Sequence, residues 1–305
     1  MKILLLGSNG QVGWELQRAL APFGSVTAVT RAVEGGLCGD LSQPDALAAT
    51  VRAVAPDVIV NAAAYTAVDQ AEDEPELAEA VNAIAPAVLA REARALGAWL
   101  VHYSTDYVFD GTGVQPWREE DPTGPLNVYG RTKREGEVAI QDSGCRHMIF
   151  RTSWVYASRG KNFIRTMLRL AAERDAMQVI DDQHGAPTGS ALIADVTAQA
   201  LPTAMRQPEL GGLYHLAAAG ETTWHGYALR VIEQARRAGW PVKVAPEAIA
   251  SVTTDAFPTK ARRPGNSRLA CSRLEDAFDL CMPPWQQGVD HALAEILACE
   301  RPKEG

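Results

Sequence analysis

The sequence predicts an α/β fold: a doubly wound parallel sheet with a smaller second lobe. Short β-branched runs alternate with longer helical patterns in the N-terminal half, and this alternation gives parallel strands joined by right-handed crossovers. A glycine-rich turn directly follows the first run, as is usual in folds of this class. The 305 residues, 47% hydrophobic and 22% charged, are sufficient to bury a full core.

Five strands, separated by helices, are predicted in chain order. The first run, Ile3–Leu6, is far shorter than the apolar core of a signal peptide, which has about 7–15 residues, and is predicted to be a buried strand. The clearest helix spans Pro75–Leu96, because apolar residues recur there at helical spacings until Gly97 ends the pattern. The remaining strands are predicted at Val26–Val29, Val58–Val60, Trp99–Tyr103 and Met148–Phe150.

The regular alternation loosens after about residue 155. Loops rich in proline and glycine, such as His184–Pro187 and Arg263–Asn266, separate scattered helices there. We therefore predict a sheet domain over residues 1–155 and a smaller lobe over residues 156–305 that is interleaved with it. The sequence contains no internal repeat and no composition break that indicates a flexible linker.

Composition and charge argue against several classes of protein. With 29 Lys+Arg against 37 Asp+Glu, the net charge of −8 disfavours nucleic-acid binding. No run approaches the roughly 18 apolar residues of a membrane span, so a cytoplasmic protein without a membrane partner is expected. The cysteines are odd in number, widely spaced and without a C-x-x-C pair, which predicts reduced thiols and neither disulfides nor a zinc site; they are Cys38, Cys145, Cys271, Cys281 and Cys299.

The turn after the first strand predicts a dinucleotide site. Gly7, Gly10 and Gly13 form a G-x-x-G-x-x-G pattern between a strand and a helix. Glycine lets the backbone approach a pyrophosphate closely, and the following helix directs free N–H groups toward the anion. The alternative is a turn that only packs a helix on a sheet, but the strand–turn–helix context favours a dinucleotide.

The end of the second predicted strand bears on the choice of cofactor. An acid at this point accepts the ribose 2′-hydroxyl of NAD, whereas an arginine tolerates the 2′-phosphate of NADP. The residues here are Thr30 and Arg31. We therefore expect NADPH to be accepted at least as well as NADH.

A tyrosine and a lysine four residues apart, Tyr129 and Lys133, indicate proton-transfer chemistry. On a helix this spacing places both side chains on one face, and a nearby cation is expected to lower the pKa of the phenol toward working pH. Thr105 stands at the end of a predicted strand, where open α/β sheets bind ligands, and can hydrogen-bond a substrate carbonyl. A Y-x-x-x-K spacing is also common on surface helices, so the glycine turn is needed to make it a site.

Several longer motifs are distributed along nearly the whole chain: Gly10–Leu16, Asn61–Asp69, Ser104–Phe109, Arg151–Tyr156 and Arg262–Ser267. Together they resemble the extended short-chain dehydrogenases/reductases, and more narrowly the dTDP-4-dehydrorhamnose reductase family. The resemblance implies a Rossmann-type fold, with NAD(P) bound by residues 1–155 and the sugar nucleotide by the smaller lobe. It also implies hydride transfer from a nicotinamide to the C4 carbonyl of dTDP-4-dehydro-L-rhamnose.

The same resemblance implies roles for individual residues. Tyr129 would donate a proton, Lys133 would hold the nicotinamide ribose and Thr105 would orient the carbonyl. Tyr129 and Thr105 would also contact the substrate, with Asp106, Trp154 and Arg263. Trp154 could instead be simple core and Arg263 a surface ion pair. The cofactor would be lined by Gly7, Asn9, Gly10, Gln11, Val12, Thr30, Arg31, Asp40, Leu41, Ala63, Ala64, Tyr65, Thr66, Tyr103, Tyr129 and Lys133.

Departures from the family pattern bear on the metal, the oligomer and the reaction. Some bacterial members dimerise through a carboxylate-bound Mg²⁺, but the corresponding segment Pro187–Leu192 has no carboxylate, so the sequence supports no metal and leaves a homodimer open. A nucleotide-sugar 4,6-dehydratase usually has Asp-Glu after the threonine, whereas Asp106 is followed by Tyr107. The sequence is also compatible with an epimerase, with a different nucleotide-sugar 4-ketoreductase, and with a non-catalytic NADP-binding subunit like the β-subunit of methionine adenosyltransferase.

Overall fold

A computed structural model describes residues 1–300 of the chain. Its centre is a six-stranded parallel sheet in the order β10-β5-β4-β3-β1-β2. The chain starts at β1 and winds outward on both sides, so β1 and β3 flank a topological switch point, where α/β sheets bind ligands. The strands are β1 (Lys2–Leu6), β2 (Ser25–Val29), β3 (Val58–Asn61), β4 (Trp99–Thr105), β5 (Arg146–Thr152) and β10 (Gly212–His215).

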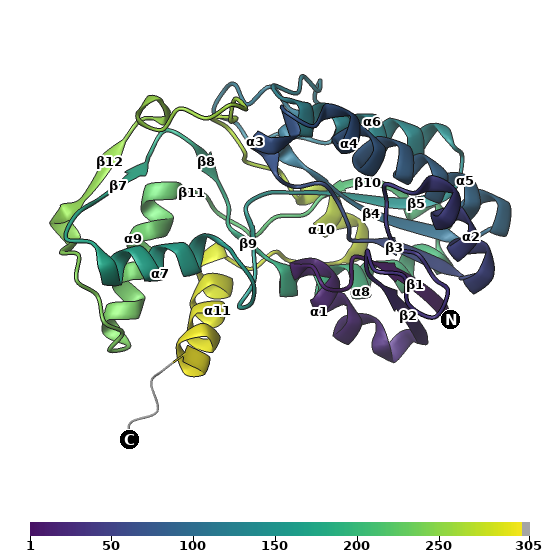
Figure 1. Cartoon of the computed structure of the whole chain (residues 1–305), viewed down its shortest axis with the longest axis horizontal. Coiled ribbons are helices and arrows are strands. Elements are labelled where there is room, and N and C mark those ends of the chain that lie inside the picture. Colours follow the sequence, from purple (N-terminus) through teal and green to yellow (C-terminus); the bar gives the residue numbers. More distant parts are fainter. Residues whose placement is uncertain (301–305) are drawn as a thin grey trace.

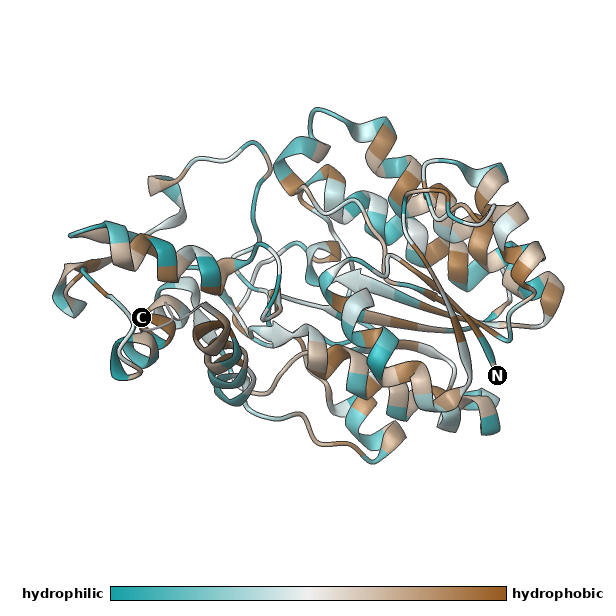
Figure 2. Cartoon of the chain, turned by 60° about the horizontal axis from the view of Figure 1, so that its bottom comes forward, coloured by the Kyte–Doolittle hydropathy of each residue, from teal (hydrophilic) through white to brown (hydrophobic). Residues whose placement is uncertain are grey.

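Helices cover both faces of this sheet, which explains why its strands are continuous apolar runs. Figure 1 shows the two layers, and Figure 2 shows apolar strands between them. One layer buries Leu16, Ile193 and Leu274 against the sheet, and the other buries Leu89 and Ile140. The first layer contains α1 (Gln11–Leu20), α8 (Ser190–Arg206) and α10 (Ser272–Phe278); the second contains α2 (Pro44–Val54), α5 (Ala85–Leu96) and α6 (Val128–Asp142).

A second body lies beside the sheet and has its own core, on the left in Figure 1. Its three helices bury Met167, Val231 and Ile296 in one cluster. Beside them, β7 and β12 form a small parallel sheet. The elements are α7 (Phe163–Glu173), α9 (Trp224–Arg237), α11 (Trp285–Glu300), β7 (Met177–Ile180) and β12 (Ile249–Val252).

The remaining elements are short strands, helices and single turns of helix. Two further strand pairs, β6–β9 and β8–β11, lie between the bodies. These elements are β6 (Val155–Tyr156), β8 (His184–Gly185), β9 (Thr188–Gly189), β11 (Thr222–Thr223), α3 (Val68–Ala71), α4 (Pro75–Glu79) and the 3₁₀ or π segments η1 (Ala21–Phe23), η2 (Ala80–Ile84), η3 (Asp106–Val108), η4 (Pro208–Leu210), η5 (Pro246–Ala248) and η6 (Thr254–Ala256).

The predicted fold class and its five strands are present. The predicted helix 75–96 is helical throughout, as α4, the π-helical η2 and α5. The sheet has one more strand than predicted, because β10 lies in the irregular second half of the sequence and joins the edge beside β5. Residues beyond 155 thus supply β10, α8 and α10 to the sheet side. Residues 301–305 of the predicted lobe lie outside the described residues.

Across residues 1–300, no helix is both long enough and apolar enough to span a membrane.

Candidate active site

A cavity of about 970 Å³ lies at the carboxyl end of the strands, on the side of the switch point. Its wall combines the glycine turn, the ends of β3, β4 and β5, the start of α6 and part of the second body. Seventeen predicted site residues line it: Gly7, Asn9, Gly10, Gln11, Val12, Arg31, Asp40, Leu41, Ala63, Ala64, Thr66, Tyr103, Thr105, Asp106, Tyr129, Lys133 and Trp154.

The glycine turn is shaped by close backbone contacts. Gly7 has φ +76°, and a Cβ atom there would lie 2.8 Å from the Ala63 nitrogen. A Cβ atom on Gly13 would lie 2.1 Å from the Gly7 oxygen, so this third glycine serves to pack α1 on the turn. Gly10 precedes α1 without a side-chain cap, which leaves the first N–H groups of the helix available to an anion. The turn therefore fits a pyrophosphate.

The adenosine end of the cavity is lined by Arg31, Asp40 and Leu41. Burial raises the pKa of Asp40, but hydrogen bonds from Ser42 and Gln43 and the charge of Arg31 outweigh it, so the pKa is lowered. Thr30 does not line the cavity, because its hydroxyl turns back to accept a hydrogen bond from the Ala32 nitrogen at 3.3 Å. Of the predicted pair Thr30 and Arg31, only Arg31 therefore lines this cavity.

The predicted proton-transfer residues meet on the cavity floor. Asn127 caps α6 by accepting a hydrogen bond from the Gly130 nitrogen at 2.8 Å, which fixes the turn that carries Tyr129. Thr105, at the end of β4, lines the same cavity as Tyr129, and its hydroxyl donates to Asp106 Oδ1 at 3.1 Å. Lys133 lies one turn farther along α6, 1% exposed, and donates to the Tyr103 carbonyl at 2.6 Å.

The predicted lowering of the tyrosine pKa is wrong for this structure. Burial raises the pKa of Tyr129 to about 12, and the side chain of Thr105 opposes this rise. Burial also lowers the pKa of Lys133 to about 8. The lysine amine is held against the backbone of β4, and Tyr129 is consequently a protonated phenol at neutral pH.

Polar atoms at the substrate end lack partners within the described residues. Asp106 is 2% exposed and its Oδ1 accepts from Thr105 at 3.1 Å, while Oδ2 has no hydrogen-bond partner. Burial raises the pKa of Asp106 to about 6, although hydrogen bonds from Ser267 and Thr105 oppose the shift. The hydroxyls of Ser104, Thr152 and Ser153 also line the cavity without partners. A ligand rich in hydroxyl groups would satisfy them.

An aromatic wall closes this end of the cavity. Trp154 has φ +48° and stacks on Trp224 of α9, with ring centroids 3.8 Å apart and an interplanar angle of 15°. Trp154 is thus a cavity wall that the second body holds in place, not interior core. Sequence reasoning missed Trp224 and Lys161 as lining residues, because both lie away from the cofactor motifs, and it did not single out Tyr107, which follows Asp106 in the Ser104–Phe109 motif.

Two other predicted residues also lie outside this cavity. The Tyr65 nitrogen donates to Asn82 Oδ1 at 2.9 Å and its hydroxyl to Glu74 at 2.7 Å, so both polar groups point into the helical layer. Arg263 forms an ion pair with Asp69 at 2.6 Å. It lines an adjoining cavity of about 870 Å³ that shares Tyr107 and Trp224 with the first.

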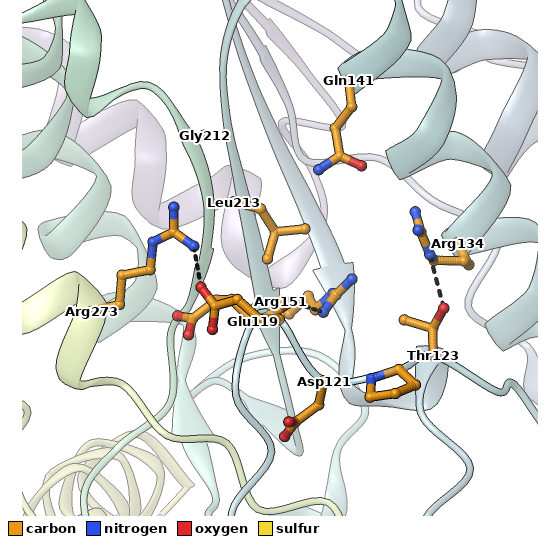
Figure 3. Close-up of a pocket in the computed structure, with 11 residues that line it drawn as sticks. Glu119, Asp121, Thr123, Arg134, Gln141, Arg151, Gly212, Leu213 and Arg273 are labelled. Carbon is orange, nitrogen blue, oxygen red and sulfur yellow. Dashed lines mark hydrogen bonds and ion pairs between the residues drawn. The ribbon is translucent and has the colours of Figure 1, made fainter.

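A separate cavity of about 500 Å³ lies at the outer edge of the sheet, beside β10 (Figure 3). Each arginine of this cavity has a carboxylate nearby that balances its charge. Arg273 pairs with Glu120 at 2.7 Å and Arg151 with Glu137 at 2.7 Å, and Arg134 lies 3.6 Å from Glu137. No cluster of three or more His, Cys, Asp or Glu side chains in residues 1–300 is arranged to hold a metal ion. Proton-transfer chemistry is therefore assigned to the cavity above the switch point.

A glycine turn at the switch point, with a Thr–Tyr–Lys group beside it, is the arrangement of the extended short-chain dehydrogenases/reductases. The family model described as "RmlD substrate binding domain" matches residues 1–298. The dTDP-4-dehydrorhamnose reductase of Salmonella typhimurium is 56% identical over 296 residues, 97% of this chain and 98% of the relative. The chain belongs to the dTDP-4-dehydrorhamnose reductase family.

Other relatives agree in sequence and in structure. The dTDP-4-dehydrorhamnose reductase of Burkholderia thailandensis is 47% identical over 302 residues, 98% of this chain and 100% of the relative. The solved structure of the Bacillus anthracis dTDP-4-dehydrorhamnose reductase, in complex with NADP, has a TM-score of 0.84 at 32% identity, covering 96% of this chain and 99% of the other. The likeness thus extends over both bodies.

Proposed function

We propose that this protein uses NADPH to reduce the C4 ketone of dTDP-4-dehydro-L-rhamnose, giving dTDP-L-rhamnose, the last step in making that sugar nucleotide. The observation that carries the proposal is the position of the Tyr129 hydroxyl, beside Thr105 in one cavity with the glycine turn. A cofactor on the turn and a ketone at the tyrosine would therefore meet across that cavity. The names and high identities of the relatives support the choice of substrate.

The residues of the cavity floor have separate tasks in this proposal. The bound nicotinamide supplies the hydride. Tyr129, whose pKa of about 12 keeps it protonated at neutral pH, holds the proton for the ketone oxygen and releases it as negative charge develops there. Thr105 fixes the phenol and the carbonyl in line, and Lys133 is placed to hold the ribose. Asp106, with Oδ2 unpartnered, accepts a hydrogen bond from a sugar hydroxyl.

The second cavity is proposed to hold the nucleotide part of the substrate. It opens from the first at Tyr107 and Trp224, and it is walled by Phe163 and Phe257, which offer apolar surface to a base. Arg263 lies on its wall. A guanidinium binds phosphate oxygens in pairs, so Arg263 would exchange its partner Asp69 for the diphosphate.

NADPH is the proposed cofactor, with NADH also accepted. Arg31 lines the adenosine end, and β2 ends without a carboxylate that a 2′-phosphate would meet. Comparing kcat/KM for NADPH and NADH tests this choice, and a strong preference for NADH would contradict it.

The deciding experiment follows NADPH absorbance with dTDP-4-dehydro-L-rhamnose as substrate. The expected result is oxidation of one NADPH for each ketone reduced. An epimerase or dehydratase recycles its cofactor, so sugar conversion without net NADPH loss would assign the protein to those classes. No NADPH loss with any nucleotide-sugar ketone, but with NADPH still bound, would favour the non-catalytic NADP-binding subunit.

A further inference from the structure

A line of buried polar side chains runs behind Lys133, away from the cavity. Asn61 ends β3 and His102 lies beside it on β4; each is 1% exposed. Asn61 Nδ2 lies 3.1 Å from His102 Nδ1, and His102 Nε2 lies 3.1 Å from Lys133 Nζ. The proposed mechanism uses neither Asn61 nor His102, and buried polar groups of this kind are stable only when they are hydrogen-bonded.

The direction of each hydrogen bond in this line follows from the first one. The Ala63 nitrogen donates to Asn61 Oδ1 at 3.2 Å, and a backbone N–H can only donate. The amide nitrogen of Asn61 therefore faces His102, and it too can only donate. His102 Nδ1 must accept this bond, which requires an unprotonated Nδ1.

The tautomer of His102 determines whether Lys133 faces a hydrogen-bond donor or an acceptor. A bare Nδ1 leaves the ring neutral, and burial, the largest influence on the pKa of His102, lowers that pKa well below its usual value. A neutral ring with a bare Nδ1 carries its hydrogen on Nε2, and this N–H is directed at Lys133 Nζ. The lysine accepts such a bond only as a neutral amine, because an ammonium group has no lone pair. Its own hydrogen then goes to the Tyr103 carbonyl.

The charged groups around Lys133 are compatible with a neutral amine at this position. Glu137, one turn along α6, favours the ammonium form, but Arg151 of β5 holds both of its oxygens, at 2.8 and 2.7 Å. Arg151 also lines the outer cavity, where Figure 3 labels it. The phenols of Tyr129 and Tyr103 are uncharged at neutral pH, and Asp106 is directed to Thr105.

We propose that His102 is a positioning residue for Lys133: held as the Nε2–H tautomer by Asn61, it presents a hydrogen-bond donor to the lysine nitrogen and favours the neutral amine in the protein without cofactor. The proposal rests on the proposed function for its kinetic consequence only. The Ala63–Asn61–His102 line links a cavity-lining backbone segment to the lysine.

The tautomer is tested directly by ¹⁵N NMR of the ring nitrogens in the full chain labelled at histidine, without cofactor, and His102→Gln assigns the signals. The expected pattern is a protonated Nε2 and a bare Nδ1. The reverse pattern, or a doubly protonated ring near pH 7, would overturn the proposal. The measurement needs no turnover, so it stands even where no ketone is reduced.

The kinetic consequence is tested with His102→Gln, whose side-chain carbonyl can face Lys133 as an acceptor. In wild type, kcat/KM is expected to fall as pH rises through about 8, because the lysine then loses its proton. In His102→Gln this alkaline limb should move up by about one pH unit. His147→Gln, on β5 and bonded to the Cys145 carbonyl, is the matched control and should leave the limb in place. A folded His102→Gln variant with an unmoved limb would show that His102 only fills space.

Discussion

The halves of the cavity that the proposed function assigns to the cofactor and to the substrate are built in different ways. The cofactor half centres on the backbone of one early strand–turn–helix unit, where a Cβ atom on Gly7 would lie 2.8 Å from the Ala63 nitrogen. The substrate half is made by side chains from distant parts of the chain, such as Trp154 and Trp224. The first half has no space for a side chain at Gly7. The shape of the second half depends on how the two bodies pack against each other. Mutations in the first half should therefore change cofactor binding, and mutations in the second half should change substrate binding.

The largest effect is expected at Tyr129, where the halves meet. Tyr129→Phe removes the proton donor and keeps the ring that packs edge-on against Tyr107 at 5.5 Å. The kcat value should fall by about 10²–10⁴, the usual contribution of a positioned acid, with NADPH affinity little changed. Steady-state kinetics and fluorescence titration of NADPH measure both quantities. Turnover at the wild-type level would refute the assigned role.

Gly7→Ala should break the cofactor half. The new methyl group would lie 2.8 Å from the Ala63 nitrogen at a φ of +76°, so the turn must open, at a cost of about 1–3 kcal/mol. NADPH should bind about tenfold or more weakly. Gly239→Ala is the control, since its φ is +79° but no atom lies within 4 Å of the added methyl group; it should lower stability and leave NADPH binding unchanged. Equal effects of the two variants on NADPH affinity would contradict this account.

Trp224→Ala should affect the substrate half alone. Loss of the stack leaves Trp154 without support, and an aromatic pair contributes about 0.5–1.5 kcal/mol, so KM for the sugar nucleotide should rise by about three- to tenfold. KM for NADPH should not change. Trp240→Ala, a tryptophan packed on the same core cluster but absent from both cavity walls, is the matched control. A parallel rise in both KM values would mean that the halves are not separable.

The smallest effect is expected at Arg31, which lies at the open end of the cofactor half and is exposed. Arg31→Ala removes one solvent-screened contact worth about 1 kcal/mol, so KM for NADPH should rise by about fivefold. KM for NADH should stay the same, because NADH has no 2′-phosphate. Comparing the two cofactors in one variant provides the control, and an equal change for both would place Arg31 away from the ribose.

Much of the fold and of the cofactor half could be predicted because the responsible interactions are local. Gly7 and Gly10 lie within one turn, and Tyr129 and Lys133 lie on one helix face, so spacing alone indicates their relation. Strand β10, Gly212–His215, was missed because it contains no β-branched residue and lies in an irregular region outside the strand–helix alternation.

The side chains that the sequence could not place are those whose direction depends on neighbours from other segments. Thr30 turns back to its own loop, Tyr65 hydrogen-bonds Asn82 and Glu74, and Arg263 pairs with Asp69, 194 positions away. The lowered pKa expected for Tyr129 fails for the same reason, because burial and the direction of the Lys133 amine are properties of the packed structure.

The amino-acid sequence by itself determined the order of strands and helices, the glycine turn and the residue types that perform the chemistry, since these follow from backbone sterics and from spacing along the chain. Only the tertiary structure decided the protonation states and the substrate wall. Whether a lysine amine meets a donor or an acceptor, and whether two tryptophans stack, depends on atoms brought together from β3, β4, α6 and α9. Burial then sets the energy of each charge.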